Sequence, residues 1–353
     1  MKALRLYGPS KIQIDDIPIP TIREQELLLK IDSCSICGSD FRNVRAGGSS
    51  HGMDLPRVLG HELVGTIVEV GAQWRDQFHE GEQVVVGAIV PCGRCPLCIQ
   101  GHPNQCQNKK AIAYQYDGAF AEYMKVPEQS IRSGNVIKVA EHDEAMRPQL
   151  ALSEPLSCAI NGQEISQVSL TDTIVIVGCG PLGLFHTQLA KLKGCSKIIC
   201  VDFDQHRLHL AKQVGADHIL SPQEVDLEEA IKELTNGIGA SVVMVAVPDP
   251  QVVQNALNWV APRGRINVFG GMPQDHQGIE LNLNIIHYQE ITIQGTSDST
   301  PKHLHQAMEL ILTDRVRTDF MITKKINLEE AKEVLLQKPD LKQIKYVVIP
   351  EAN

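Results

Sequence analysis

The chain has 353 residues, 43% hydrophobic and 21% charged, which is typical of a globular protein with room for two domains. Its formal net charge of −9, without any basic block, argues against nucleic acid or an anionic membrane as partner. The sequence contains no apolar run of about 18 residues, so we expect no transmembrane helix. It has ten cysteines and no recognisable secretory signal, which favours thiols and metal ligands in the reducing cytoplasm over disulfides.

The first part of the chain alternates short apolar runs with glycine and proline, a pattern typical of a β-rich, barrel-like domain. Buried strands are expected over 27–31, 63–70 and 83–86, and the stretch 118–123 reads as a turn into another strand.

Three ligand types that zinc accepts lie within one segment of this domain. Cys37-Gly38-Ser39-Asp40 opens the segment with a thiol, and Gly60-His61-Glu62 closes it with an imidazole and a carboxylate. A further carboxylate, Glu154, stands in Leu152-Ser153-Glu154-Pro155-Leu156. The two ends of the segment meet only if the chain between them doubles back. The hypothesis is a catalytic zinc with mixed ligands; the alternative is a buried cysteine, a core histidine and two surface acids.

A second cysteine cluster follows, with a spacing that suits a closed metal site. Two consecutive Cys-x-x-Cys turns are joined by a fourth thiol from a short loop, and glycines and prolines are expected to keep this lobe out of regular structure. Four thiolates leave no open position, so the ion is expected to be structural zinc. An iron–sulfur cluster or free thiols are the alternatives. The residues are Cys92, Cys95, Cys98 and Cys106.

From about residue 155, strands begin to alternate with helices. The β-branched run 173–177 predicts a fully buried parallel strand and leads into a Gly-x-Gly-x-x-Gly turn, a helix that ends at Gly194, and a second strand that ends at Asp202. This is the full context of a dinucleotide-binding fingerprint. Asp202 would bind the adenosine ribose hydroxyls and repel a 2′-phosphate, which favours NAD over NADP. The predicted cofactor-binding residues are Gly178, Gly180, Pro181, Leu182, Gly183, Asp202 and Arg207.

The alternation continues as a doubly wound parallel sheet. Helices are expected over 205–214, about 224–235 and 250–260, and strands near 215–220, 242–247, 265–271 and 290–295. A helix over 302–313 and a final strand at 346–350 form a tail too short to fold alone. This tail is expected to return to the first domain.

These segments, in this order, resemble the zinc-containing medium-chain dehydrogenase/reductase family along nearly the whole chain. The resemblance implies an α/β protein with a GroES-like catalytic domain over 1–155 and 296–353, a zinc lobe at 91–107, and an NAD-binding Rossmann domain over 156–295. Glu154-Pro155-Leu156 is similar to the polyol branch, which includes sorbitol dehydrogenases.

The resemblance also assigns roles. Cys37 and His61 are implied ligands of a catalytic zinc, and Glu62 and Glu154 share the carboxylate role, one of them through water. The alternative for Glu62 is an acid that supports the site or the fold without binding the metal. Ser39 is the implied first acceptor of the substrate hydroxyl proton, although a turn serine is the alternative. Two zinc ions per chain follow, one catalytic and one structural.

One position departs from the family. Many members have a relay histidine two residues after the motif's aspartate, whereas this chain has Arg42 there and Arg45 nearby. Arginine stays charged and cannot relay protons, but it can bind a phosphate or carboxylate of the substrate. A solvent-exposed arginine is the other interpretation. His51 is a candidate substitute relay.

The predicted function is reversible, NAD-linked oxidation of a secondary alcohol of a polyol or sugar derivative, with phosphorylated and acidic derivatives included. A threonine- or simple-alcohol-type dehydrogenase is the alternative on the same scaffold, and a non-catalytic zinc-binding relative is the alternative of another class. Relatives pair the last Rossmann strands, here near 290–295 with the apolar Ile285-Ile286 before them, so a homodimer or homotetramer is expected.

Overall fold

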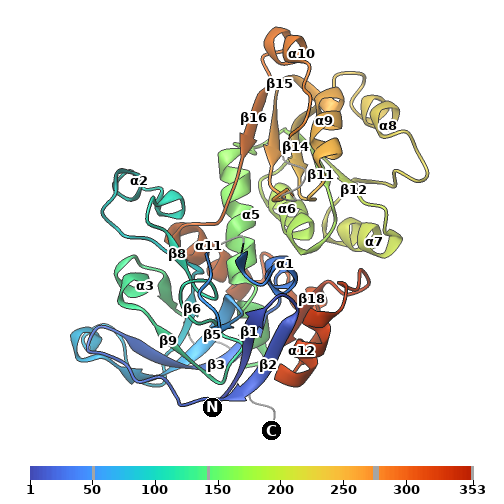
Figure 1. The fold of residues 1–353 in the computed structure, drawn as a ribbon. Helices are drawn as coiled ribbons and strands as arrows, with labels where there is room; N and C mark the ends of the chain where they lie inside the picture. The colour runs from blue at the N-terminus through green and yellow to red at the C-terminus, as the bar shows by residue number, and fades with distance from the viewer. Residues whose placement is uncertain (50–51, 141–143, 273–277, 351–353) are drawn as a thin grey trace. The chain divides into compact units, whose positions relative to one another are not determined.

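The computed structural model describes residues 1–49, 52–140, 144–272 and 278–350 (Figure 1). His51 lies outside these residues. The chain divides into two compact units, Met1–Ser157 with Asp298–Asn353, and Cys158–Ser297. Among the described helices, none is both long and apolar enough to cross a bilayer.

The first unit is built on an antiparallel seven-stranded sheet. Its strands follow the order β10-β6-β5-β3-β18-β17, and β9 also pairs with β3. Only β17 and β18 run parallel to each other. The strands are β3 (Leu27–Ser35), β5 (Glu62–Val70), β6 (Gln83–Val86), β9 (Tyr123–Val126), β10 (Val136–Lys138), β17 (Ile322–Ile326) and β18 (Lys345–Val348).

Smaller elements complete this unit. A three-stranded sheet contains β1 (Lys2–Gly8), β2 (Lys11–Asp16) and β4 (Arg57–Val58), and a two-stranded sheet contains β7 (Ile89–Val90) and β8 (Lys110–Ala111). The helices are α1 (Gly38–Ala46), α2 (Pro96–Ile99), α3 (Glu128–Arg132), α4 (Arg147–Leu150), α11 (Pro301–Leu312) and α12 (Leu328–Leu336), with short 3₁₀ turns η2 (Ala72–Trp74), η3 (Pro103–Gln105), η4 (Glu144–Met146) and η5 (Asp319–Met321). Helix α5 (Ser153–Ile165) begins in this unit and ends in the other.

Strand register brings distant parts of the sequence together at one end of the large sheet. Ser35, near the end of β3, lies opposite Glu62, the first residue of β5. Val347 of the C-terminal strand β18 lies opposite the same Ser35. The segment that follows β3, the start of β5 and the tail of the chain therefore converge. The pairing of β3 with β5 shows that the chain doubles back between residues 37 and 62, as the meeting of the two ends of this segment requires.

The second unit is a six-stranded parallel sheet in the order β13-β12-β11-β14-β15-β16. The strands are β11 (Thr173–Val177), β12 (Lys197–Val201), β13 (His218–Leu220), β14 (Ala240–Val245), β15 (Val260–Val268) and β16 (Thr292–Gly295), and the helices are α6 (Pro181–Leu192), α7 (Gln205–Val214), α8 (Leu227–Leu234), α9 (Pro250–Trp259) and α10 (Leu283–Tyr288) (Figure 1). The predicted α/β fold, with a GroES-like part and a doubly wound parallel sheet, is confirmed.

Several local predictions were wrong in detail. The four-cysteine lobe contains regular turns, α2 and η3, rather than irregular chain alone. Helix α8 begins only at Leu227, because the Asp226 carboxylate caps it by accepting the Glu229 N–H. Strand β16 begins at Thr292, because Glu290 has a φ of +53° and cannot continue a strand.

Candidate active site

The site begins where β3 gives way to α1. Cys37 keeps an extended backbone, with φ −93° and ψ 154°, and the helix starts at the next residue. The Asp40 carboxylate accepts the Cys37 N–H at 2.9 Å, so it satisfies one of the amides that a helix start leaves unpaired. Asp40 thereby fixes the turn that presents the Cys37 thiol.

Cys37, His61 and Glu62 form one close group. Their potential ligand atoms all lie within 4.8 Å of one another, and the two residues from the start of β5 are buried. A thiolate, an imidazole and a carboxylate at this spacing are ligands that zinc accepts.

Polar groups lie beside both nitrogens of the His61 ring. Nδ1 lies 3.6 Å from Asp40 Oδ1, and Nε2 lies 3.4 Å from Ser39 Oγ. Burial disfavours protonation, but the Asp40 carboxylate and then Cys37 outweigh it and raise the pKa of His61 well above its usual value. A carboxylate beside one ring nitrogen is the usual way in which proteins orient a metal-binding histidine through its other nitrogen.

The two oxygens of the Glu62 carboxylate have different surroundings. Oε2 accepts hydrogen bonds from Ser35 Oγ and from Lys345 Nζ. Oε1 is buried and, within the described residues, has no hydrogen-bond partner. A buried carboxylate oxygen without a partner is costly, and a carboxylate oxygen of Glu62 lies within 4.8 Å of the Cys37 and His61 ligand atoms. The residues therefore fit a zinc ion.

Glu154 lies in the first turn of α5 and is 8% exposed. Its carboxylate is not a member of the close group found among the described residues. Burial is the main cause that raises the pKa of Glu154, to about 7; the charge of His61 opposes the rise and that of Glu62 adds to it.

Arg42 and Ser39 occupy the same helix start. Arg42 is exposed, and its guanidinium lies close to Gly38, where an added Cβ would be 3.9 Å from Nη1. Ser39 reaches His61, as described above.

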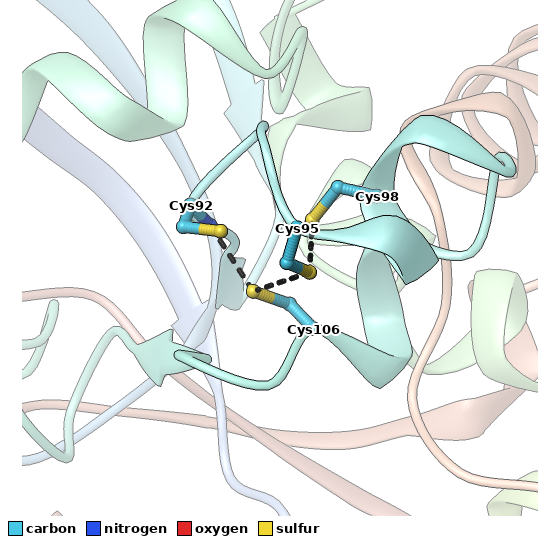
Figure 2. A group of neighbouring side chains, drawn as sticks. All are labelled: Cys92, Cys95, Cys98 and Cys106. Atoms are coloured by element: carbon cyan, nitrogen blue, oxygen red, sulfur yellow. Dashed lines mark hydrogen bonds between the residues drawn. The ribbon is translucent and has the colours of Figure 1, made fainter.

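The four predicted lobe cysteines point toward one another (Figure 2). Cys95 Sγ lies 3.5 Å from Cys98 Sγ and 3.8 Å from Cys106 Sγ, and the Cys92 N–H is 3.2 Å from Cys106 Sγ. Backbone N–H groups near the thiol lower the pKa of Cys95 to about 6, chiefly that of Cys98. None of the four lobe cysteines is in a disulfide. This arrangement fits a closed tetrahedral ion.

The glycine-rich turn of the second unit joins β11 to α6. Gly178 has a φ of +95°, and a Cβ on Gly183 would lie 1.7 Å from the Gly178 carbonyl oxygen. Gly180 is the N-cap of α6, and the Arg207 guanidinium lies beside it, 3.6 Å from where a Cβ would be.

The Asp202 side chain stabilises this turn through hydrogen bonds to the backbone. Its carboxylate accepts the Cys179 N–H at 2.7 Å and the Asp204 N–H at 2.9 Å. A buried acid at the end of the second strand, bonded to the glycine-rich turn, is the arrangement of a dinucleotide site.

Two residues of the first site were missed from the sequence. Ser35 and Lys345 bond to Glu62 from the neighbouring strands β3 and β18. The available clue was a lysine inside the otherwise apolar run Ile344-Lys345-Tyr346-Val347-Val348.

The chain matches two family models, an alcohol dehydrogenase GroES-like domain over residues 23–138 and a zinc-binding dehydrogenase over 181–313. It is 33% identical to a sorbitol dehydrogenase of Bacillus subtilis, over 95% of this chain and 92% of the relative. It is 30% identical to an L-threonine 3-dehydrogenase of Symbiobacterium thermophilum, over 99% of this chain and 98% of the relative. A protein of Sinorhizobium meliloti, described as a zinc-binding dehydrogenase and solved bound to NADP, has a TM-score of 0.91 at 30% identity and covers 99% of each chain.

Proposed function

The chain belongs to the zinc-containing medium-chain dehydrogenase/reductase family, and from that premise we propose that it catalyses reversible, NAD-linked oxidation of a secondary alcohol in a polyol or sugar derivative to the ketone. It is a zinc-type alcohol dehydrogenase, so its partner is a small molecule. The convergence of Cys37, His61 and Glu62 carries the proposal, together with a Glu62 Oε1 that has no hydrogen-bond partner among the described residues.

In this proposal Cys37, His61 and Glu62 hold a catalytic zinc, and Glu154 is the nearby second carboxylate. When bound, the zinc acts as a Lewis acid that makes the substrate hydroxyl more acidic. Asp40 keeps the His61 ring in place through Nδ1. Ser39, whose Oγ lies 3.4 Å from His61 Nε2, would accept the proton that leaves the substrate hydroxyl and at the same time pass its own hydroxyl proton onward toward solvent. The four lobe cysteines hold a second, structural zinc, which gives two ions per chain.

NAD is the proposed hydride acceptor. Gly178, Gly180 and Gly183 shape the turn at the start of α6, where backbone N–H groups favour the pyrophosphate. The flanking Pro181 and Leu182 form the first helical positions, and Arg207 lies beside Gly180. Asp202 is buried and negatively charged, so a 2′-phosphate next to it is disfavoured.

Arg42 is the proposed determinant of substrate class. It is an exposed cation on α1, and its guanidinium lies close to Gly38, the residue before Ser39. A guanidinium there suits a phosphate or carboxylate on the substrate.

A screen of NAD reduction tests the proposal. The panel contains polyols, polyol phosphates, aldonates and amino alcohols at matched concentration. Turnover of a polyol or its derivative, abolished by Cys37→Ser, is expected. An Arg42→Met variant is expected to lose preference for the anionic members only. Turnover confined to amino alcohols would contradict the polyol assignment.

A threonine-type activity is the second candidate, because a relative named L-threonine 3-dehydrogenase is 30% identical over nearly the whole chain. The amino alcohols in the panel distinguish the two activities.

We further assign residues 1–155 and 296–353 to the catalytic domain, with its zinc lobe at 91–107, and 156–295 to the cofactor domain. Strand β16 is the last strand of its sheet, and α10 before it exposes Leu283 and Tyr288. A homodimer or homotetramer that pairs this edge in the cytoplasm completes the proposal.

A further inference from the structure

Lys345 is a buried cation in the last strand of the chain. It is only 4% exposed, and lysine is almost never buried this far unless it is paired. Nζ donates to the Ile36 carbonyl oxygen at 3.0 Å and to Glu62 Oε2. The lysine therefore joins the tail of the chain to the residue before Cys37 and to the carboxylate that follows His61.

Lys345 and Ser35 both donate hydrogen bonds to the same oxygen of Glu62. Both donors approach Oε2, one from β18 and one from β3. The other oxygen, Oε1, is left without a hydrogen-bond partner among the described residues. Two donors from two paired strands hold Oε2, which leaves Oε1 as the carboxylate oxygen available to a metal ion.

Charge gives a second reason for a lysine at this position. A zinc ion with the Cys37 thiolate and the Glu62 and Glu154 carboxylates would carry one surplus negative charge in a buried place. Both carboxylates are less than a tenth exposed. Uncompensated buried charge is strongly unfavourable. The Lys345 ammonium offsets one negative charge of this group, to which the buried Asp40 carboxylate beside His61 adds a further one.

We propose that Lys345 is a positioning residue of the catalytic metal site: with Ser35 it holds Oε2 of Glu62, presents Oε1 to the zinc, and balances the second carboxylate. This inference rests on the proposed function. Without the lysine, Glu62 loses its fixed orientation, and the site is left with the surplus charge. Loss of such a supporting partner commonly weakens metal binding by about 10- to 100-fold.

The test measures zinc binding in the full-length holoenzyme and three variants. Lys345→Met keeps the length of the side chain without its charge, and Lys345→Arg restores a cation. Lys324→Met is the matched control, because Lys324 lies on the adjacent strand β17 and pairs with exposed Glu330. Chelator competition gives the affinity of each zinc, and the four-cysteine ion serves as an internal standard for an intact fold.

Lys345→Met is expected to weaken one of the two zinc ions by about 10- to 100-fold, with the other unchanged. Lys345→Arg is expected to recover affinity, and Lys324→Met to match wild type. Replacement of the weaker ion by Co²⁺ should give visible bands in Lys345→Met that differ from wild type, since Glu62 is presented differently. Unchanged affinity and unchanged bands would overturn the proposal.

If Lys345→Met also loses the four-cysteine zinc, its fold has failed and Ser35→Ala decides instead. That variant removes only a hydroxyl donor to the same oxygen. A weaker catalytic zinc with shifted Co²⁺ bands supports the proposal, and wild-type behaviour overturns it. A wild-type protein with a single zinc would instead contradict the proposed function itself.

Discussion

Alanine at two glycines of the β11–α6 turn should impair different properties: stability at Gly183 and NAD binding at Gly180. At Gly183 the new Cβ would lie 1.7 Å from the Gly178 carbonyl oxygen, so backbone must move by about 1.3 Å to reach even the 3.0 Å lower limit of real contacts. Overpacking of this kind costs about 1–3 kcal/mol, and alanine returns up to about 1 kcal/mol of helix propensity. Because the clash is with backbone, the cost is expected at the upper end of that range, and the net loss in the free energy of unfolding is about 2 kcal/mol.

Gly180→Ala should behave differently, because its nearest neighbour is Arg207 at an ordinary 3.6 Å. Stability should fall by no more than about 1 kcal/mol, the usual cost of alanine at an N-cap, whereas NAD affinity should fall about tenfold or more because the Cβ would obstruct the approach of the pyrophosphate. Gly271→Ala, with open space around its Cβ, is the control for both properties. Denaturant unfolding and titration with NAD measure the two effects. Wild-type NAD affinity in Gly180→Ala would refute the assigned role of this turn.

Three further predictions concern single side chains. Cys37→Ser should abolish NAD reduction while NAD binding, followed by fluorescence, stays nearly unchanged; surviving turnover would show that the thiol is not a ligand. Asp202→Ser should shift the ratio of NADP to NAD activity upward, since it removes a buried negative charge, and an unchanged ratio would remove Asp202 from cofactor choice. His186 is fully buried, both ring nitrogens lack a hydrogen-bond partner among the described residues, and burial lowers its pKa to about 3. The unfolded chain therefore binds the extra proton first, and stability should fall as pH drops from about 6.5 toward 3, by about 2 kcal/mol at pH 5. His186→Leu should remove that part of the pH slope in denaturant unfolding, and exposed His209→Gln should keep it.

Patterns within one segment of the sequence predicted most of the second unit. The run 173–177, the glycine spacing and Asp202 are local features, and the parallel sheet follows from the alternation of strands and helices. The errors arose at the ends of helices and strands, where single residues such as Asp226 and Glu290 determine at which residue the element begins.

The first site was predicted less completely, because strand register, rather than sequence proximity, builds it. Cys37, His61 and Glu62 could be named from the family motif, but Ser35 and Lys345 come together with Glu62 only through the pairing of β3 with β5 and β18. A sequence separation of 283 residues between Glu62 and Lys345 leaves no periodic pattern to read. The capping role of Asp40 also depends on α1, a helix that the sequence interpretation did not include.

The central claim is a catalytic zinc beside a structural one, and metal analysis of the purified full-length protein tests it most directly. The expected result is two zinc ions per chain, falling to one in Cys37→Ser. One zinc in the wild type, or two retained in Cys37→Ser, would contradict the claim.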